Sequence, residues 1–145
     1  MTESWAAMVA TFNKANGYRP LVFPSANVEI SVKILRLRLM MEELGELSCA
    51  MHENNLVEIA DGLTDLLYVV VGTAVDYGLG PILEELFQEV QRSNMTKTFI
   101  TTPDGRKGGI KGPGFSPPDI KGVIDGFVER YWNTTPESKK EKVDG

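Results

Sequence analysis

The residues best suited to chemistry are seven carboxylates between positions 42 and 65, with no basic residue among them: Glu42, Glu43, Glu46, Glu53, Glu58, Asp61 and Asp65. The chain has no Lys or Arg anywhere between Arg38 and Arg92, and the same stretch is rich in Leu, Val and Met. A half-buried carboxylate without a partner is costly, so it either becomes protonated or binds a cation. Oxygen ligands of this kind suit Mg²⁺ or Mn²⁺ better than zinc or copper. The alternative is a pair of solvated acidic helix faces.

The spacing of these acids favours the cation site. Glu43 and Glu46 are three residues apart, so on a helix they share one face, with Cβ atoms about 5–6 Å apart. Three further acids follow an i, i+3, i+7 pattern and share a face of the next helix: Glu58, Asp61 and Asp65.

The two helices that carry these faces should be joined by a tight turn. Asn54 and Asn55 interrupt the helical pattern, and Asn55 is expected to be an N-cap, with Glu58 completing a variant capping box. Helices joined by so short a turn pack antiparallel. The two acidic faces should therefore meet across one interhelical groove.

The remaining elements follow from hydrophobic periodicity and from Gly and Pro. Helices are expected over residues 3–16 (capped by Thr2), from about 25 or 27 to 53, and over 56–77, 81–94 and 118–131. Residues 18–24 should form an extended connector. Residues 95–117 are expected to be an irregular, lid-like loop rich in Gly, Pro and Lys, with a turn at 103–105. We expect a single domain over 1–132 and a disordered tail over 133–145.

Composition narrows the class of protein. The chain has 145 residues, 42% of them hydrophobic and 24% charged, which is ordinary for one globular domain. Its net charge of −5 conceals an asymmetry, because eleven of the 20 acids and none of the 15 bases lie in residues 39–91. The acidity argues against binding of DNA or RNA, and the longest apolar run, 66–71, is too short for a membrane span. The single Cys49 is expected to be a buried small hydrophobe, and it fits a reducing cytoplasm.

Four blocks of the sequence together resemble a known family: LRLRLMMEELGEL (35–47), EIADGLTDLLYVVVGTAVDYGL (58–79), EVQRSNMTK (89–97) and DGRKGGIKGPGFSPPDI (104–120). The chain resembles the all-α nucleoside triphosphate pyrophosphohydrolases, or MazG-like enzymes, and is most similar to their short bacterial and phage branch. The resemblance implies an all-α fold, an antiparallel bundle of four to five helices completed by oligomerisation. It also implies a homodimer or a dimer of dimers, located in the host cytoplasm if the chain is phage-encoded.

The resemblance also implies an activity. Such enzymes use two or three Mg²⁺ ions, for which Mn²⁺ can substitute, to convert a (deoxy)nucleoside triphosphate and water to the monophosphate and pyrophosphate. Glu42, Glu43 and Glu46 match the first half of the family's EExxE…ExxD pattern. The second half leaves two registers open. If Asp65 is the final acid, Gly62 stands three residues before it in place of Glu; if Glu58 and Asp61 are the ExxD pair, Asp65 lies one turn further along the same face. The implied metal ligands are Glu43, Glu46, Glu58, Asp61 and Asp65, and Glu42 or Glu43 is the implied proton acceptor.

The basic residues have an implied role in binding the substrate. Arg92, Lys97, Arg106, Lys107 and Lys111 lie beside or within the expected lid, which could close over the phosphates. Asn94 could bind sugar, base or phosphate, and the first helix offers a base pocket from Trp5, Phe12 and Asn13. Residues at that helical spacing also suit a plain core. The phage-type resemblance favours (d)GTP.

Three alternatives remain open at this level. The first is a house-cleaning diphosphatase acting on dUTP or dUDP. The second is a non-catalytic helical module that binds a basic partner through its acidic face. The third, a di-iron bundle, would need Glu-x-x-His on two helices, and His52 is the only histidine. It is expected at the surface near the interhelical turn.

Overall fold

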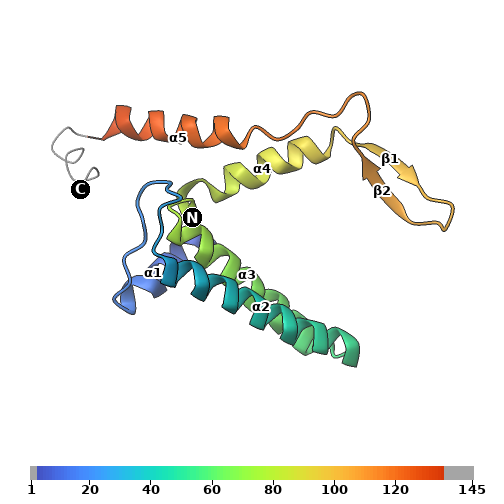
Figure 1. The fold of residues 1–145 in the computed structure, drawn as a ribbon, viewed down its shortest axis with the longest axis horizontal. Coiled ribbons are helices and arrows are strands. Elements are labelled where there is room, and N and C mark those ends of the chain that lie inside the picture. Colours follow the sequence, from blue (N-terminus) through green and yellow to red (C-terminus); the bar gives the residue numbers. More distant parts are fainter. Residues whose placement is uncertain (1–2, 136–145) are drawn as a thin grey trace. The chain divides into compact units, whose positions relative to one another are not determined.

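A computed structural model describes residues 3–135 of the chain. Its elements are α1 (Trp5–Ala15), α2 (Ile30–Glu53), α3 (Leu56–Asp76), the 3₁₀ turn η1 (Gly80–Ile82), α4 (Leu83–Asn94), strands β1 (Thr98–Thr101) and β2 (Lys107–Ile110), and α5 (Ile120–Thr134) (Figure 1). The expected all-α class is confirmed, with a small two-stranded sheet added. The chain divides into two compact units, Met1–Pro81 and Ile82–Gly145, which are described separately below.

Helix α1 is fixed at both ends by its sequence. The Ser4 hydroxyl accepts a hydrogen bond from the Ala7 amide at 3.2 Å and is the N-cap. The cap was expected at Thr2, which lies outside the described residues, and the helix starts two residues later than expected. Gly17, with φ +77°, ends the helical region as predicted.

The antiparallel α2–α3 hairpin is confirmed and forms the long arm of the first unit in Figure 1. Asn54 ends α2 in the left-handed conformation, with φ 56°. The Asn55 side chain caps α3 by accepting from the amides of Val57 and Glu58, as predicted. A Cβ atom at Gly62 would lie 3.2 Å from the Leu47 Cα, so glycine lets the two helix backbones approach closely.

The long second helix begins later than expected, at Ile30 rather than at 25 or 27. Pro24 disfavours a helical residue before it. The Ser25 hydroxyl accepts from the Asn27 amide, and the Ser25 amide donates to the Tyr77 carbonyl at 3.0 Å, so this segment bonds to itself and to the end of α3. Gly78 has φ +69°, and a side chain there would collide with the Phe23 carbonyl.

The core of the first unit is thin. Its buried apolar residues are Ala6, Val9, Leu47, Ala50, Val69, Val71 and Val75. By contrast, the apolar stripe expected to be the inner face of α2 is largely open, and Ile34, Leu37, Met41 and Leu44 are each at least 56% exposed. Most of this stripe is therefore not buried by the chain's own helices.

The second unit corrects the expectation of an irregular segment after α4. Residues 98–101 and 107–110 form an antiparallel hairpin that pairs Thr98 with Ile110 and Thr101 with Lys107. The turn at 103–105 is confirmed, with Gly105 at φ +83°. The β-branched and aromatic residues of TFIT favour a strand, whereas the glycines of KGGI obscured its partner.

Helix α5 starts at Ile120, after the Ser116-Pro117-Pro118 sequence, and its N-cap Asp119 accepts from the Gly122 amide at 2.8 Å. It continues to Thr134, two residues into the segment expected to be a disordered tail, and residues 136–145 lie outside the described part. Within that part, no single helix is long and apolar enough to cross a membrane. Only the bent pair 56–76 and 80–94 would qualify, by length and composition alone.

Candidate metal centre

The α2–α3 hairpin brings acids from both helices around Glu43. The side chain of Glu43 is half-buried, whereas the six other acids of the 42–65 segment are exposed. Burial raises the pKa of Glu43, and four surrounding carboxylates raise it further: Asp65, Glu46, Glu42 and Asp61. Two of these lie on α2 and two on α3. Acids of both helices therefore act on the pKa of Glu43, as expected if the two acidic faces lie near one another.

Gly62 explains the departure from the family's ExxD spacing. It is buried against the backbone of Leu47, so the position three before Asp65 has no room for a ligand side chain. Asp61 and Asp65 lie on either side of Gly62 in the sequence, and both raise the pKa of Glu43. Glu58 is not among the groups that shift the pKa of Glu43.

Glu58 instead lines an open groove of about 520 Å³ together with residues of α2: Met41, Glu42, Gly45, Glu46, Cys49, Ala50 and Glu53. Glu46 therefore takes part in both arrangements. Cys49 is exposed in this groove, so the expectation that it is buried was wrong. It lies one turn beyond Glu46, on the acidic side of the helix rather than the apolar one.

Crowded carboxylate oxygens are the donor set that a hard divalent cation prefers, so these residues fit Mg²⁺ or Mn²⁺. In the described part of the chain, however, no three His, Cys, Asp or Glu side chains are grouped closely enough to hold a metal ion. The helices bring the acids to one face without bringing them into coordination. The ligand set named from the sequence stays a prediction.

One charged pair in this unit was missed from the sequence. Arg36 Nε lies 2.5 Å from Asp76 Oδ2, and the two side chains are only 14% and 1% exposed. A Cβ atom at Gly72 would lie 2.9 Å from Arg36 Nη1, so glycine makes room for the guanidinium. Asp76 had been counted among the acids without a cation, and Arg36 corrects this. The pair spans 40 positions, which no local pattern reveals.

Of the three candidate base-binding residues on the first helix, Phe12 contacts α3 near the acids. Phe12 meets the ring of Tyr68, one turn beyond Asp65, edge to face with centroids 6.0 Å apart. Asn13 is buried, and its Nδ2 has no hydrogen-bond partner among the described residues. Trp5 is 62% exposed and lies eight residues from Asn13, about 12 Å along the helix axis. Trp5 and Asn13 are therefore not brought together.

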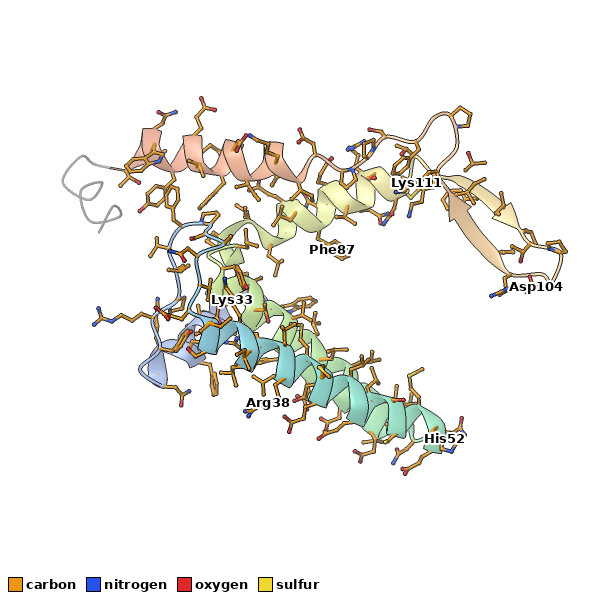
Figure 2. All side chains as sticks on the ribbon, viewed as in Figure 1. Lys33, Arg38, His52, Phe87, Asp104 and Lys111 are labelled. Atoms are coloured by element: carbon orange, nitrogen blue, oxygen red, sulfur yellow. The ribbon has the colours of Figure 1, made fainter. Side chains whose placement is uncertain are left out.

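The basic residues of the second unit each contact different groups. The Arg92 guanidinium contacts Glu89, Ser116 and Pro117. The stem of Lys97 lies over Gly109, and Lys111 Nζ lies 5.2 Å from the centre of the Phe115 ring. Asn94 is exposed at the end of α4. Arg106 pairs with Asp104 at the hairpin tip, 2.7 Å apart, and His52 lies at the exposed end of α2 as predicted (Figure 2).

Comparison with known proteins gives two findings. Residues 9–94, more than half of the chain, match the family model described as phosphoribosyl-ATP pyrophosphohydrolase. The match runs from within α1 to the end of α4 and includes every acid of the candidate site, but not the hairpin or α5. A second similarity is to an uncharacterized protein of Acanthamoeba polyphaga mimivirus, 53% identical over 45 residues. That segment is 31% of this chain and 18% of the viral protein.

Proposed function

Because the chain belongs to the phosphoribosyl-ATP pyrophosphohydrolase family, we propose that it is a Mg²⁺-dependent nucleoside triphosphate pyrophosphohydrolase. This family is part of the MazG-like all-α superfamily, whose members cleave acid anhydrides, so the resemblance is confirmed at that level. The short bacterial and phage branch stays a prediction. The observation that carries the proposal is the convergence of carboxylates from two helices on Glu43, inside the matched region and with no base among them.

The proposed roles follow from these surroundings. Glu43, Glu46, Asp61 and Asp65 hold the cations, with Glu58 at the edge of the site. Bound Mg²⁺ would neutralise the polyphosphate and acidify the attacking water. Glu43, the half-buried carboxylate of the group, is the first candidate for accepting the proton of the attacking water. Glu42 is the alternative.

The base of the substrate is proposed to lie toward α1, in the same unit as the acids. Asn13 has a buried Nδ2 group free to donate a hydrogen bond to a base carbonyl, next to the Phe12–Tyr68 ring pair. Lys97 and Lys111 would bind phosphates. A base carbonyl is present in guanine, uracil and cytosine, so the leaning to (d)GTP rests on the sequence resemblance, with dUTP or dUDP as the alternative.

The matched family favours a second candidate substrate, phosphoribosyl-ATP, which presents the same triphosphate. The test is a panel of eight ribo- and deoxynucleoside triphosphates plus phosphoribosyl-ATP, incubated with Mg²⁺, with Mn²⁺ or with a chelator. The expected products are a monophosphate and pyrophosphate without orthophosphate, with label from ¹⁸O-water in the monophosphate. Label in pyrophosphate would mean attack at the β-phosphorus. Absence of both hydrolysis and metal affinity would favour the non-catalytic acidic module.

The exposed apolar stripe of α2 supports a further part of the proposal. Ile34, Leu37, Met41 and Leu44 follow one another along α2 at helical spacing, and all four are exposed, as in an apolar face that binds a partner. We propose that a second copy covers it, giving a homodimer or a dimer of dimers. Light scattering at micromolar concentration should find no monomer, and a stable monomer would refute this part.

A further inference from the structure

Arg92, in the last turn of α4, directs its guanidinium at Glu89 and at the segment that leads into α5. Its Nε and Nη2 donate to the two Glu89 oxygens at 2.9 and 2.8 Å. Nη2 also donates to the Pro117 carbonyl at 2.9 Å, and Nη1 donates to the Ser116 hydroxyl at 3.1 Å. A guanidinium has five N–H donors, so these four bonds leave little capacity for a phosphate.

Two more side chains at this end of α4 hold the same segment. Glu89 is 16% exposed, and its Oε1 also accepts from the Asp119 amide at 2.7 Å. Thr96 Oγ1 accepts from the Ser116 amide at 2.8 Å and donates to the Ser93 carbonyl at 2.7 Å. Residues 116–119 are therefore fastened to α4 at Glu89, Arg92 and Thr96.

The two lysines assigned to phosphate lie between this fastened segment and the hairpin. Lys97 stands between Thr96, which holds Ser116, and the first β1 residue. Lys111 is followed by Gly112, where a side chain would collide with the Thr98 hydroxyl. The lysines occupy the register position just beyond the last pair of the ladder, Thr98 and Ile110. Figure 2 shows Lys111 at the base of the hairpin and Asp104 at its tip.

We propose that Glu89 and Arg92 form a clamp that fixes residues 116–119 to α4, and that both are positioning residues for Lys97 and Lys111. The positioning role rests on the proposed function, since it assumes that these lysines bind phosphate. The clamp itself is a property of the fold. Substitution of Glu89 distinguishes a clamp from direct phosphate binding by Arg92. A carboxylate repels phosphate, and both Glu89 oxygens already accept hydrogen bonds from Arg92 and the Asp119 amide.

The experiment compares Glu89→Ala, Arg92→Ala and Arg92→Lys, with Arg130→Ala as the matched control. Arg130 pairs with Glu85 in the same unit, at 2.9 Å to both oxygens, without contacting residues 116–119. Amide exchange of Ser116 and Asp119 is followed by NMR, and KM and kcat are measured with the best triphosphate of the panel. Opening of the clamp should speed exchange by about tenfold in all three clamp variants. KM should rise about tenfold with kcat nearly unchanged, while Arg130→Ala matches the wild type in both measurements.

Other results would show whether the clamp or the positioning role is wrong. If Glu89→Ala lowers KM or leaves it unchanged while Arg92→Ala raises it, Arg92 binds phosphate itself and the positioning role is wrong. Wild-type KM in Arg92→Lys would point the same way, because a lysine keeps the charge but not the forked geometry. Unchanged exchange in the Ala variants would refute the clamp. If no nucleotide is hydrolysed, the positioning role fails with the proposed function, and the exchange rates alone decide the clamp.

Discussion

The α2–α3 hairpin and the C-terminal unit both carry many acids, but they arrange them differently. Around Glu43 the carboxylates face one another, and within residues 3–135 no base pairs with any acid of the 42–65 segment. In the second unit, four acids form ion pairs: Glu85 with Arg130, Glu89 with Arg92, Asp104 with Arg106, and Asp125 with Lys121.

This difference indicates that the acids of the two regions have different roles. A paired acid that is shielded from solvent, such as Glu89, stabilises the structure around it, whereas an exposed ion pair contributes little. Crowded acids without a Lys or Arg partner raise the free energy of the metal-free fold, and the cation of the proposed function would offset their repulsion. The two regions should therefore respond to the same kind of substitution in different ways.

The largest expected effect concerns the one buried pair of the acidic unit. Arg36→Ala or Asp76→Ala leaves an uncompensated buried charge, which typically costs about 3–5 kcal/mol of the free energy of unfolding. Urea denaturation followed by circular dichroism measures the loss. Asp104→Ala, at an exposed pair, is the control and should change little. The double variant Arg36→Met/Asp76→Leu should recover much of the stability; if it does not, the pair has a role beyond charge compensation.

Removing a crowded acid should affect turnover and leave the fold intact. Glu46→Gln and Asp65→Asn should each lower kcat/KM by about a hundredfold, roughly 2.7 kcal/mol of transition-state stabilisation, and weaken Mg²⁺ binding. The helical circular dichroism should stay unchanged. Asp125→Asn, in the paired region, is the control. A variant that kept more than about a tenth of the wild-type rate would exclude that residue as a ligand.

These contrasts also show how far the sequence could predict the molecule. Local patterns predicted helices α1, α3 and α4 and the turn at Asn54 and Asn55. These patterns are hydrophobic periodicity, capping residues and terminal glycines, and each depends on residues that are close together in the sequence. The meeting of the acidic faces followed from the short turn. The KGGI strand was missed because glycines carry no strand preference and only its pairing with TFIT defines it.

What the sequence could not predict depends on contacts between distant residues. The Arg36–Asp76 pair forms across 40 positions and the Arg92–Ser116 contact across 24. Arg92 in particular was assigned to the substrate because its charge is visible in the sequence while its partners are not. Gly62 was interpreted as a departure from a ligand motif, whereas in the structure it lies close against the α2 backbone at Leu47.

The lysines at the hairpin base should give a smaller effect. Lys97→Ala and Lys111→Ala should each raise KM for the triphosphate by about tenfold, and should raise it less for the diphosphate if these lysines reach the terminal phosphate. Lys121→Ala is the control, because Lys121 pairs with Asp125. An equal loss for both nucleotides would place the lysines on another part of the ligand. An unchanged KM for both nucleotides would mean that Lys97 and Lys111 are solvated side chains that do not contact the substrate.

The smallest expected effect is on the pH dependence of the melting temperature, which should differ between substitutions of Glu43 and of Glu89. The folded pKa of Glu43 is raised above 4.5, so without metal its charge destabilises the fold at neutral pH, and this penalty fades as pH falls through the folded pKa toward 4.5. Hydrogen bonds from Arg92 and the Asp119 amide lower the pKa of Glu89 to about 2. Its contribution is therefore favourable above pH 4.5 and is lost as pH falls toward 2. At pH 7 and without metal, the melting temperature of Glu43→Gln should be higher than that of the wild type, and the melting temperature of Glu89→Gln should be lower. Near pH 4.5 the difference between Glu43→Gln and the wild type should disappear, whereas the difference between Glu89→Gln and the wild type should remain. Saturating Mg²⁺ should reverse the first difference and leave the second, whereas shifts of the same sign in both variants would contradict the contrast between the two regions.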